Sequence, residues 1–118
     1  TSGARTTAGM FLTGANPDAI AIDPSGKFAY VANSTSNSIS AYTINAGSGA
    51  LTPVTGTFLT GFNPNAIAIH PTGKFVYVTN YGGGVSAYTI NATSGALTTA
   101  GTFLTGANPS CVATVNIP

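Results

Sequence analysis

Charged residues are what this sequence lacks most: three Lys or Arg and two Asp or Glu make up 4% of its 118 residues, beside one histidine. Three cations spread along a chain cannot form the basic patch that nucleic acids or anionic membranes require. No apolar run reaches the roughly 20 residues that cross a membrane. Thr, Ser, Asn and Gly supply the polarity instead, so we expect an extracellular or cell-surface protein without nucleic-acid partners or membrane insertion.

Cysteine and histidine occur once each, as Cys111 and His70. A lone cysteine forms no disulfide within the chain. Because the repeats described below have alanine at its position, we interpret Cys111 as a small buried side chain. The alternatives are an intermolecular disulfide or a nucleophilic thiol, which would need His70 as its base. One His, one Cys and two Asp without ligand spacing predict no metal site and no cofactor.

What the sequence contains is a repeat. Residues 14–33, GANPDAIAIDPSGKFAYVAN, align with residues 61–80, GFNPNAIAIHPTGKFVYVTN, and residues 39–52 align with residues 85–98. Partial copies stand at both ends, because residues 2–14 match residues 94–106 and residues 100–118 begin a third copy. The period of roughly 45 to 47 residues lies in the range of propeller blades.

Each repeat predicts four short strands, at residues 18–22, 27–32, 38–45 and 50–60 in the first copy. Ala alternates with Ile in the first of these, which indicates a strand buried on both faces. In the fourth, Pro53 and Gly56 indicate an edge strand with a bulge. Gly or Pro interrupts every candidate helix. The predicted fold class is therefore all-β, with four-stranded antiparallel propeller blades.

We divide residues 1–118 as a single domain of about two and a half blades. The division is into the fourth strand of a preceding blade (1–13), a first blade (14–60), a second blade (61–106) and the first strand of a further blade (107–118). Propellers close with about four to eight blades, so this chain cannot close a ring alone. Its expected partners are copies of itself in a homo-oligomer, or the remaining blades of a longer propeller. Closure by copies leaves one blade without its two middle strands unless the ends rearrange.

The segment KFVYVTN (74–80), with HPTG before it and VSAYTI after it, resembles the YVTN-repeat, lactonase-like seven-bladed β-propeller family. KFAYVAN (27–33) is a slightly altered copy, and the resemblance covers essentially the whole chain. Members of that family include 6-phosphogluconolactonases, secreted or surface-layer propellers and repeats of adhesion proteins. The resemblance therefore implies a propeller with either lactone hydrolysis or a binding or scaffold role.

Five loops are expected at the mouth of the propeller channel: residues 13–18, 33–37, 60–65, 80–84 and 105–110. Asparagine precedes proline in three of them, and the residue after that proline is Asp18, Asn65 or Ser110. Together with an aromatic side chain these residues predict a mouth that binds a neutral polar or sugar ligand. The candidate ligand-binding residues are Asn16, Asp18, Asn63, Asn65, Tyr81 and Asn108. The alternative is that the asparagines only shape turns and that Asp18 is drift between copies.

Catalysis has little support in these loops. The three glycines of NYGGG (80–84) lack the helix start or lysine of a phosphate cradle, so they predict a flexible hairpin turn. His70 precedes a turn at the opposite end of the strands, where we expect it to cap that turn or to face solvent. Lactone hydrolysis calls for His, Arg or carboxylate side chains, and the mouth loops contain one Asp and no cation. We therefore predict a non-enzymatic, self-assembling scaffold or binding module. The alternative is part of a lactonase-like hydrolase, with catalytic residues outside this chain or across protomers.

Overall fold

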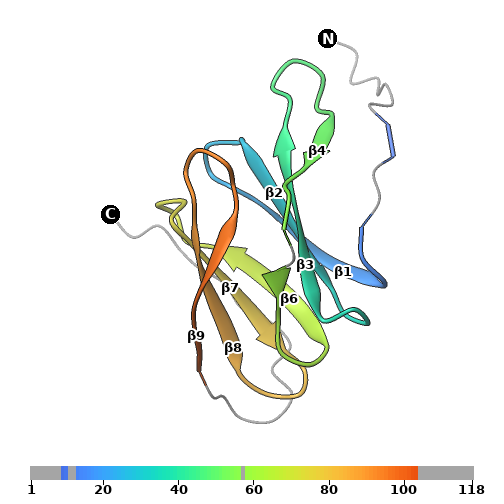
Figure 1. Ribbon diagram of the computed structural model, residues 1–118, viewed down its shortest axis with the longest axis vertical. Helices are drawn as coiled ribbons and strands as arrows, with labels where there is room; N and C mark the ends of the chain where they lie inside the picture. The colour runs from blue at the N-terminus through green and yellow to red at the C-terminus, as the bar shows by residue number, and fades with distance from the viewer. Residues whose placement is uncertain (1–8, 11–12, 57, 104–118) are drawn as a thin grey trace.

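The structure is a computed structural model that describes residues 9–10, 13–56 and 58–103. These residues form two antiparallel sheets and no helix (Figure 1). The first sheet, here the first blade, contains β1 (Pro17–Ile22), β2 (Phe28–Asn33), β3 (Ser38–Ile44) and β4 (Leu51–Pro53), with β5 (Phe58–Leu59) also paired to β3. The second blade contains β6 (Pro64–Ile69), β7 (Phe75–Asn80), β8 (Val85–Ile90) and β9 (Leu97–Phe103). The prediction of all-β propeller blades is confirmed.

The turn between the first two strands has the same geometry in both blades. Gly26 donates its N–H to the carbonyl of Asp23 at 2.8 Å, and Gly73 donates to His70 at the same distance. The two glycines have φ of 77° and 74°, a left-handed conformation that glycine adopts without steric cost. The Pro–Ser/Thr–Gly sequence therefore fixes where β1 and β6 end.

The outermost strand differs between the blades. In the second blade β9 pairs with β8 from Leu97 to Phe103, whereas in the first blade pairing to β3 stops at Pro53 and resumes at Phe58. Proline has no N–H to donate to the ladder, and the first repeat has one residue more at this place. The expectation was one edge strand with a bulge at Pro53 and Gly56, whereas the structure has two short strands, β4 and β5, that pair separately with β3.

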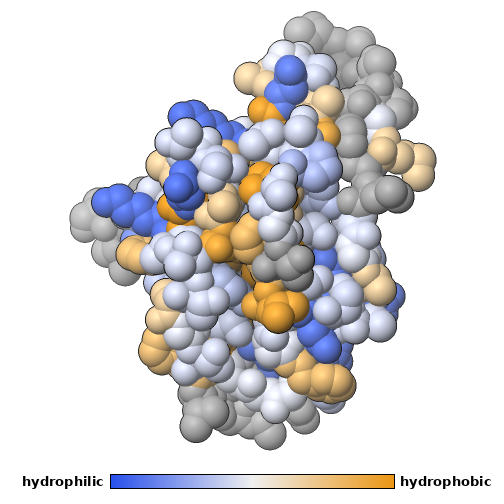
Figure 2. Space-filling view, viewed as in Figure 1, coloured by the Kyte–Doolittle hydropathy of each residue, from blue (hydrophilic) through white to orange (hydrophobic). Residues whose placement is uncertain are grey.

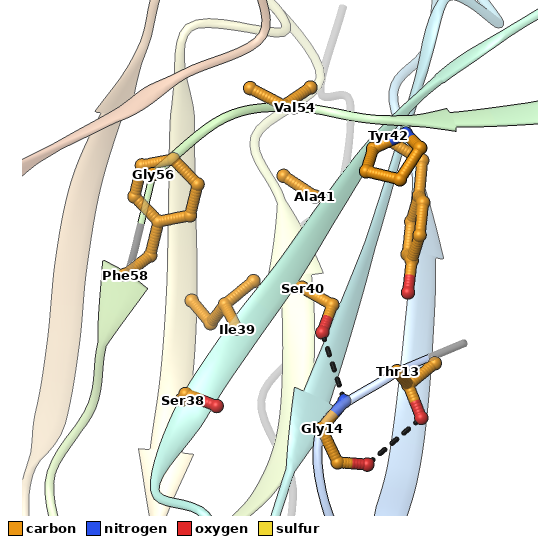
Figure 3. A pocket seen from close by; sticks show the side chains of 11 residues that line it. Thr13, Gly14, Ser38, Ile39, Ser40, Ala41, Tyr42, Val54, Gly56 and Phe58 are labelled. Atoms are coloured by element: carbon orange, nitrogen blue, oxygen red, sulfur yellow. Dashed lines mark hydrogen bonds between the residues drawn. The ribbon is translucent and has the colours of Figure 1, made fainter. Parts of the chain in front are cut away.

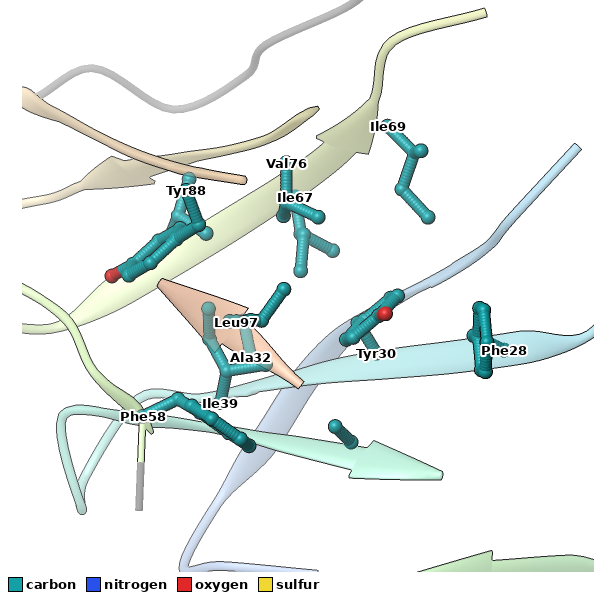
Figure 4. Close-up of a cluster of buried hydrophobic side chains, with 12 residues drawn as sticks. Phe28, Tyr30, Ala32, Ile39, Phe58, Ile67, Ile69, Val76, Tyr88 and Leu97 are labelled. Carbon is teal, nitrogen blue, oxygen red and sulfur yellow. The ribbon is translucent and has the colours of Figure 1, made fainter. Parts of the chain in front are cut away.

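The main hydrophobic core lies between the two blades (Figure 4). Burial of each large side chain there contributes roughly 1.5–3 kcal/mol. The first blade contributes Phe28, Tyr30, Ala32, Ile39, Ala41 and Phe58, and the second contributes Ile67, Ile69, Val76, Val78, Tyr88 and Leu97. Figure 2 shows apolar side chains gathered between the two sheets, with polar residues around them. The fold is therefore held together by the apposed faces of the two blades.

Two tyrosine hydroxyls cross this interface. Tyr30 donates to the carbonyl oxygen of Gly95 at 2.7 Å, and Tyr88 donates to that of Leu59 at 2.6 Å. Burial raises the pKa of Tyr30, and the negative charge of Asp23 raises it further. Burial also raises the pKa of Tyr88, against a smaller opposite effect of a hydrogen bond with Ser86. Both hydroxyls thus keep their protons where the blades meet.

One expectation about burial is wrong in the first blade. The strand over residues 18–22 was expected to be buried on both faces, but Ile20 and Ile22 of β1 are 60% and 51% exposed. Their repeat equivalents in β6, Ile67 and Ile69, are each 9% exposed because they pack against the first blade. The difference arises because, among the described residues, no blade packs against the face of β1 that carries Ile20 and Ile22.

Some predictions lie outside the described residues. Residues 107–118 and most of residues 1–13 belong to this group, so the flanking strands assigned there, and the place of Cys111, stay predictions. Within the described part of the chain, no helix is long and apolar enough to cross a membrane.

Candidate functional site

The four described loops of the predicted channel mouth lie at one end of the two blades. Ser34 donates its backbone N–H to the carbonyl of Asn16 at 2.9 Å, which joins two loops of the first blade. Asn37 accepts a 2.7 Å bond from the N–H of Asn63 through its side-chain oxygen, which joins the blades. Tyr81 donates its N–H to the carbonyl of Asn63 at 2.9 Å. The loops therefore form one connected surface, here called the mouth end.

Asn16 and Asn63 occupy the same backbone conformation in the two repeats. Their φ angles are 60° and 58°, in the left-handed region that asparagine tolerates better than most residues. Each carbonyl accepts a hydrogen bond from the neighbouring loop, from Ser34 and from Tyr81 respectively. Both residues therefore shape the mouth-end loops through their backbones. Asn108, their counterpart in the third copy, lies outside the described residues.

Asp18 and Asn65 lie at irregularities in strand pairing that the sequence did not reveal. Pro17 pairs with Asn33 and Ala19 with Ala32, so Asp18 is the extra residue of a bulge, and Asn65 has the same place between Pro64 and Ala66. Bulges re-aim a side chain relative to the sheet. The Asn65 oxygen accepts a 2.8 Å bond from the Thr79 hydroxyl. The two equivalent positions thus have different surroundings.

Asp18 is exposed at the rim of a largely apolar cavity of about 320 Å³. The lining residues are Thr13, Pro17, Asp18, Ala19, Ile20 and Val31. A carboxylate in this place can accept hydrogen bonds from a ligand or hold a water molecule. Among the described lining residues there is no cationic side chain that could stabilise an oxyanion beside it.

The mouth end of the second blade presents two aromatic side chains. Tyr81 is 46% exposed and Phe62 is 69% exposed. The N–H of Gly82 donates to the carbonyl of Phe62 at 3.2 Å, and a Cβ at Gly82 would lie 3.2 Å from the Phe62 side chain. The sequence analysis missed Phe62. The signal was an aromatic residue at a position where the other copies have Ala15 and Ala107.

The glycine run of residues 82–84 forms a tight hairpin turn between β7 and β8. Gly83 donates its N–H to the carbonyl of Asn80 at 2.8 Å, and Asn80 donates back to Gly84 at 3.1 Å. Gly83 and Gly84 have φ of 116° and 94°. The expected hairpin turn is therefore confirmed, and it brings Tyr81 beside the loop of Phe62.

Two buried amides support the mouth-end loops from inside. Asn33 and Asn80, the last residues of β2 and β7, are fully buried, and their side-chain nitrogens donate to Ser40 and Ser86 at 3.0 Å. The side-chain oxygen of each has no hydrogen-bond partner among the described residues. A Cβ at Gly61 would lie 2.9 Å from the Asn80 side chain, so the loop needs glycine to pass over it. These asparagines are structural, and the recurrence of Asn at both strand ends was their signal.

A second cavity of about 340 Å³ opens where the outer strand leaves β3 (Figure 3). Val54, Phe58 and Ile39 supply apolar lining. The hydroxyl of Ser40 accepts a 3.2 Å bond from the N–H of Gly14 in the same wall. The cavity follows from the interrupted outer strand of the first blade, and neither Phe62 nor Tyr81 lines it.

His70 and Asp23 lie at the opposite end of the blades and serve turns. The ring nitrogen Nδ1 of His70 lies 2.9 Å from the Thr72 hydroxyl and accepts the Thr72 N–H at 3.2 Å. Asp23 accepts the N–H of Ser25 at 3.0 Å and also bonds the Ser25 hydroxyl. The turn-capping role expected for His70 is confirmed. In the part of the chain that the structure describes, no three His, Cys, Asp or Glu residues gather as a metal site would require.

Comparison with known families gives one match over nearly the whole chain: a family model described as lactonase, 7-bladed beta-propeller, matches residues 4–114. A functionally unknown protein from Desulfotomaculum acetoxidans has 30% sequence identity and a TM-score of 0.69, over 76% of this chain and 27% of that one. A comparison with curated proteins finds no match.

Two further solved structures are described as candidate 6-phosphogluconolactonases. The protein from Bacteroides fragilis is 26% identical, with a TM-score of 0.73 over 78% of this chain and 26% of that one. The protein from Bacteroides uniformis is 25% identical, with a TM-score of 0.74 over 84% of this chain and 30% of that one. The chain thus spans between 26% and 30% of the length of these three solved proteins.

Proposed function

The chain belongs to the lactonase, seven-bladed β-propeller family, and we propose that it supplies two propeller blades whose mouth end binds a neutral, sugar-like ligand. The observation that carries this proposal is the pair of exposed aromatic residues, Phe62 and Tyr81, on two loops joined by backbone hydrogen bonds. Ligand sites typically combine aromatic side chains with a few placed polar groups. A sugar ring offers apolar C–H faces to such rings and hydroxyls to amides.

The charge of the mouth end supports a neutral ligand. Asp18 is the one charged side chain of the described mouth-end loops, and the remaining polar groups there are amides, hydroxyls and backbone groups. An anionic ligand would meet no cation in these loops, whereas bound phosphate usually needs Arg, Lys or a helix N-terminus. The scarcity of charge along the whole chain supports a place of action outside the cell or at its surface.

Lactone hydrolysis is the second candidate function. It is supported by the family and by the Bacteroides relatives described as candidate 6-phosphogluconolactonases. Asp18 beside its cavity is the described residue that could act as a general base toward water. Stabilisation of the oxyanion and binding of a phosphate would then fall to residues of other blades or of another protomer.

The proposal is tested by nuclear magnetic resonance, with D-glucose and D-glucono-1,5-lactone as probes. We expect the probes to shift backbone amide signals of residues 60–65 and 80–84, and Phe62→Ala with Tyr81→Ala to abolish those shifts. Phe75→Ala is the matched control, since this aromatic side chain is 36% exposed and packs against His70 at the opposite end of the blades. Shifts confined to the turns near His70 and Asp23, or none with either probe, would contradict the proposal.

A further inference from the structure

The contact between the two blades is a template for contacts that the chain leaves open. Residues 61–80 repeat residues 14–33, and residues 85–98 repeat residues 39–52, so the positions in these segments have an equivalent on the other blade. The first blade covers the second through Phe28, Tyr30 and Phe58, which are at most 9% exposed. The second blade contributes Ile67 and Ile69 of β6 to the same contact. Each blade therefore uses one of its two faces in this interface and turns the other outward.

The outward face of the first blade has the composition of a buried face. Ile20 and Ile22 are the repeat equivalents of Ile67 and Ile69. The side chains of Ile20 and Ile22 are 60% and 51% exposed, whereas those of Ile67 and Ile69 are each 9% exposed. Gly49 is the equivalent of Gly95, with φ of 79° against 80°. Gly49 is exposed and Gly95 is buried against Phe28. We call Ile20, Ile22 and Gly49 the leading face.

The outward face of the second blade repeats the side chains with which the first blade covers the second. Phe75, Tyr77 and Phe103 are the equivalents of Phe28, Tyr30 and Phe58. Phe75 and Phe103 are 36% and 57% exposed, and Tyr77 is half-buried. The ring centroids of Phe75 and Tyr77 lie 6.5 Å apart, the same separation as in the buried pair of Phe28 and Tyr30. We call Phe75, Tyr77 and Phe103 the trailing face, and two of its rings already have the separation found in the interface.

We propose that the trailing face of one copy of this chain binds the leading face of a second copy, in the manner in which the first blade binds the second. This inference goes beyond the proposed ligand binding and does not rest on it. The two faces are complementary because their equivalents already pack together within one chain. Among Ile20, Ile22, Gly49, Phe75, Tyr77 and Phe103 no charge would be buried. The contact joins the described sheets of two copies, and it requires that residues 107–118, which are predicted to begin a further blade, leave the trailing face open.

The template also specifies a polar contact between copies. Within the chain Tyr30 donates to the Gly95 carbonyl at 2.7 Å. The Tyr77 hydroxyl of one copy is therefore assigned to the Gly49 carbonyl of the next. The turns that hold the two glycines match, since Gly49 donates to Asn45 and Gly95 to Asn91 at 2.8 Å in both cases.

The symmetry of the contact determines the kind of assembly. Because two different faces meet, the interface is heterologous and generates a ring when the rotation closes. The described residues of one copy supply two blades, so these residues of three or four copies give six or eight blades, within the four to eight of closed propellers. The expected assembly is thus a trimer or a tetramer.

The test uses two variants, each with one face disabled, whose masses are measured by native mass spectrometry and light scattering. One carries Ile20→Lys and Ile22→Lys, and the other carries Phe75→Lys and Phe103→Lys. We expect the unaltered chain at three or four times its 11.6 kDa and each variant alone at 11.6 kDa. The lost burial weakens association by about tenfold or more for each isoleucine. An equimolar mixture should form a dimer that grows no further, because each variant supplies the face that the other lacks.

Phe62→Lys is the control, since Phe62 is an exposed aromatic residue outside both faces and should leave the assembly mass unchanged. The proposal is overturned if the unaltered chain stays at 11.6 kDa at all concentrations. In that case blades other than those of a second copy would cover the two faces. It is equally overturned by variants that keep the assembly mass. The proposal is also overturned if the mixture stays monomeric while both variants show the circular dichroism of a folded β-sheet. A monomer that still binds glucose would leave the proposed ligand site intact.

Discussion

Tyr30 of β2 donates a 2.7 Å hydrogen bond to the carbonyl oxygen of Gly95, 65 residues further along the chain, across the interface between the two blades. The repeat contains the same pair once more, as Tyr77 and Gly49, on the two outward faces. The chain thus contains one buried contact between blades. It also contains two exposed faces that repeat the two sides of this contact. Equivalent substitutions in the two repeats therefore separate the energetics of packing from those of the isolated blade.

Tyr30→Phe is expected to lower the free energy of unfolding by about 1–3 kcal/mol, because it leaves a buried carbonyl oxygen without its donor. Tyr77→Phe is the matched control. It should change that free energy by less than about 0.5 kcal/mol when measured on the monomer. Urea unfolding followed by circular dichroism at low protein concentration measures both. Equal effects of the two substitutions would show that the Tyr30 bond does not hold the blades together.

Gly95→Ala is expected to destabilise the fold more than Gly49→Ala. Both residues have a φ near 80°, so both variants carry the backbone cost of roughly 1–2 kcal/mol for a left-handed alanine. At Gly95 the new Cβ would in addition lie 2.6 Å from the Phe28 ring, which must move. We expect a difference of about 1–3 kcal/mol, the usual cost of overpacking. Thermal unfolding of the two variants measures this difference. If the difference is absent, the Phe28 ring can move aside without a cost in stability.

Alkaline pH is expected to destabilise the fold through its buried tyrosines. Burial raises the pKa of Tyr30 and of Tyr88 in the folded chain, whereas an unfolded tyrosine ionises at about 10. Below that pH both states keep the proton and stability does not depend on these groups. Above it the unfolded chain releases protons that the folded chain retains, so the free energy of unfolding falls.

Urea unfolding between about pH 8 and about pH 11 tests this dependence. The fall should begin near the pKa of unfolded tyrosine and should be smaller in Tyr30→Phe. A flat profile in the unaltered chain, or an identical fall in the variant, would speak against burial of the Tyr30 hydroxyl.

Asn80→Ala is expected to lower the free energy of unfolding by about 1–3 kcal/mol, since a fully buried amide and its bond to Ser86 are lost. Asn91→Ala is the control. Asn91 also accepts hydrogen bonds from its own turn, but it is exposed, so we expect about 1 kcal/mol or less. Differential scanning calorimetry compares the two. A smaller loss at Asn80 than at Asn91 would remove it as a support of the mouth end.

The sequence predicted the strands and turns because their signals are local. Alternation of apolar residues, the Pro–Gly turns, and the pair Pro53 and Gly56 in the outer strand act within a few residues. Burial could not be predicted in the same way. Ile20 and Ile67 have the same neighbours in sequence, and only the presence of a blade against one of them makes one exposed and the other buried.

That four of the predicted loops lie together could be predicted from the sequence, whereas the detail of these loops could not. Recurrent Asn–Pro loops located the mouth end, yet the bulges at Asp18 and Asn65 depend on pairing with the next strand. Phe62 was visible only as a departure from the alanines of the other copies. Such a departure gains its meaning once the structure brings the loop of Tyr81 beside it.

We propose that the mouth end binds a neutral ligand without a catalytic group of its own, and hydrolysis of D-glucono-1,5-lactone distinguishes this proposal most directly from the lactonase alternative. The rate of lactone loss with the purified chain is compared with the spontaneous rate, for the unaltered chain and for Asp18→Asn. The account predicts no acceleration over the spontaneous rate in either case. Turnover above that rate that disappears in Asp18→Asn would contradict it and would assign Asp18 to a lactone hydrolase.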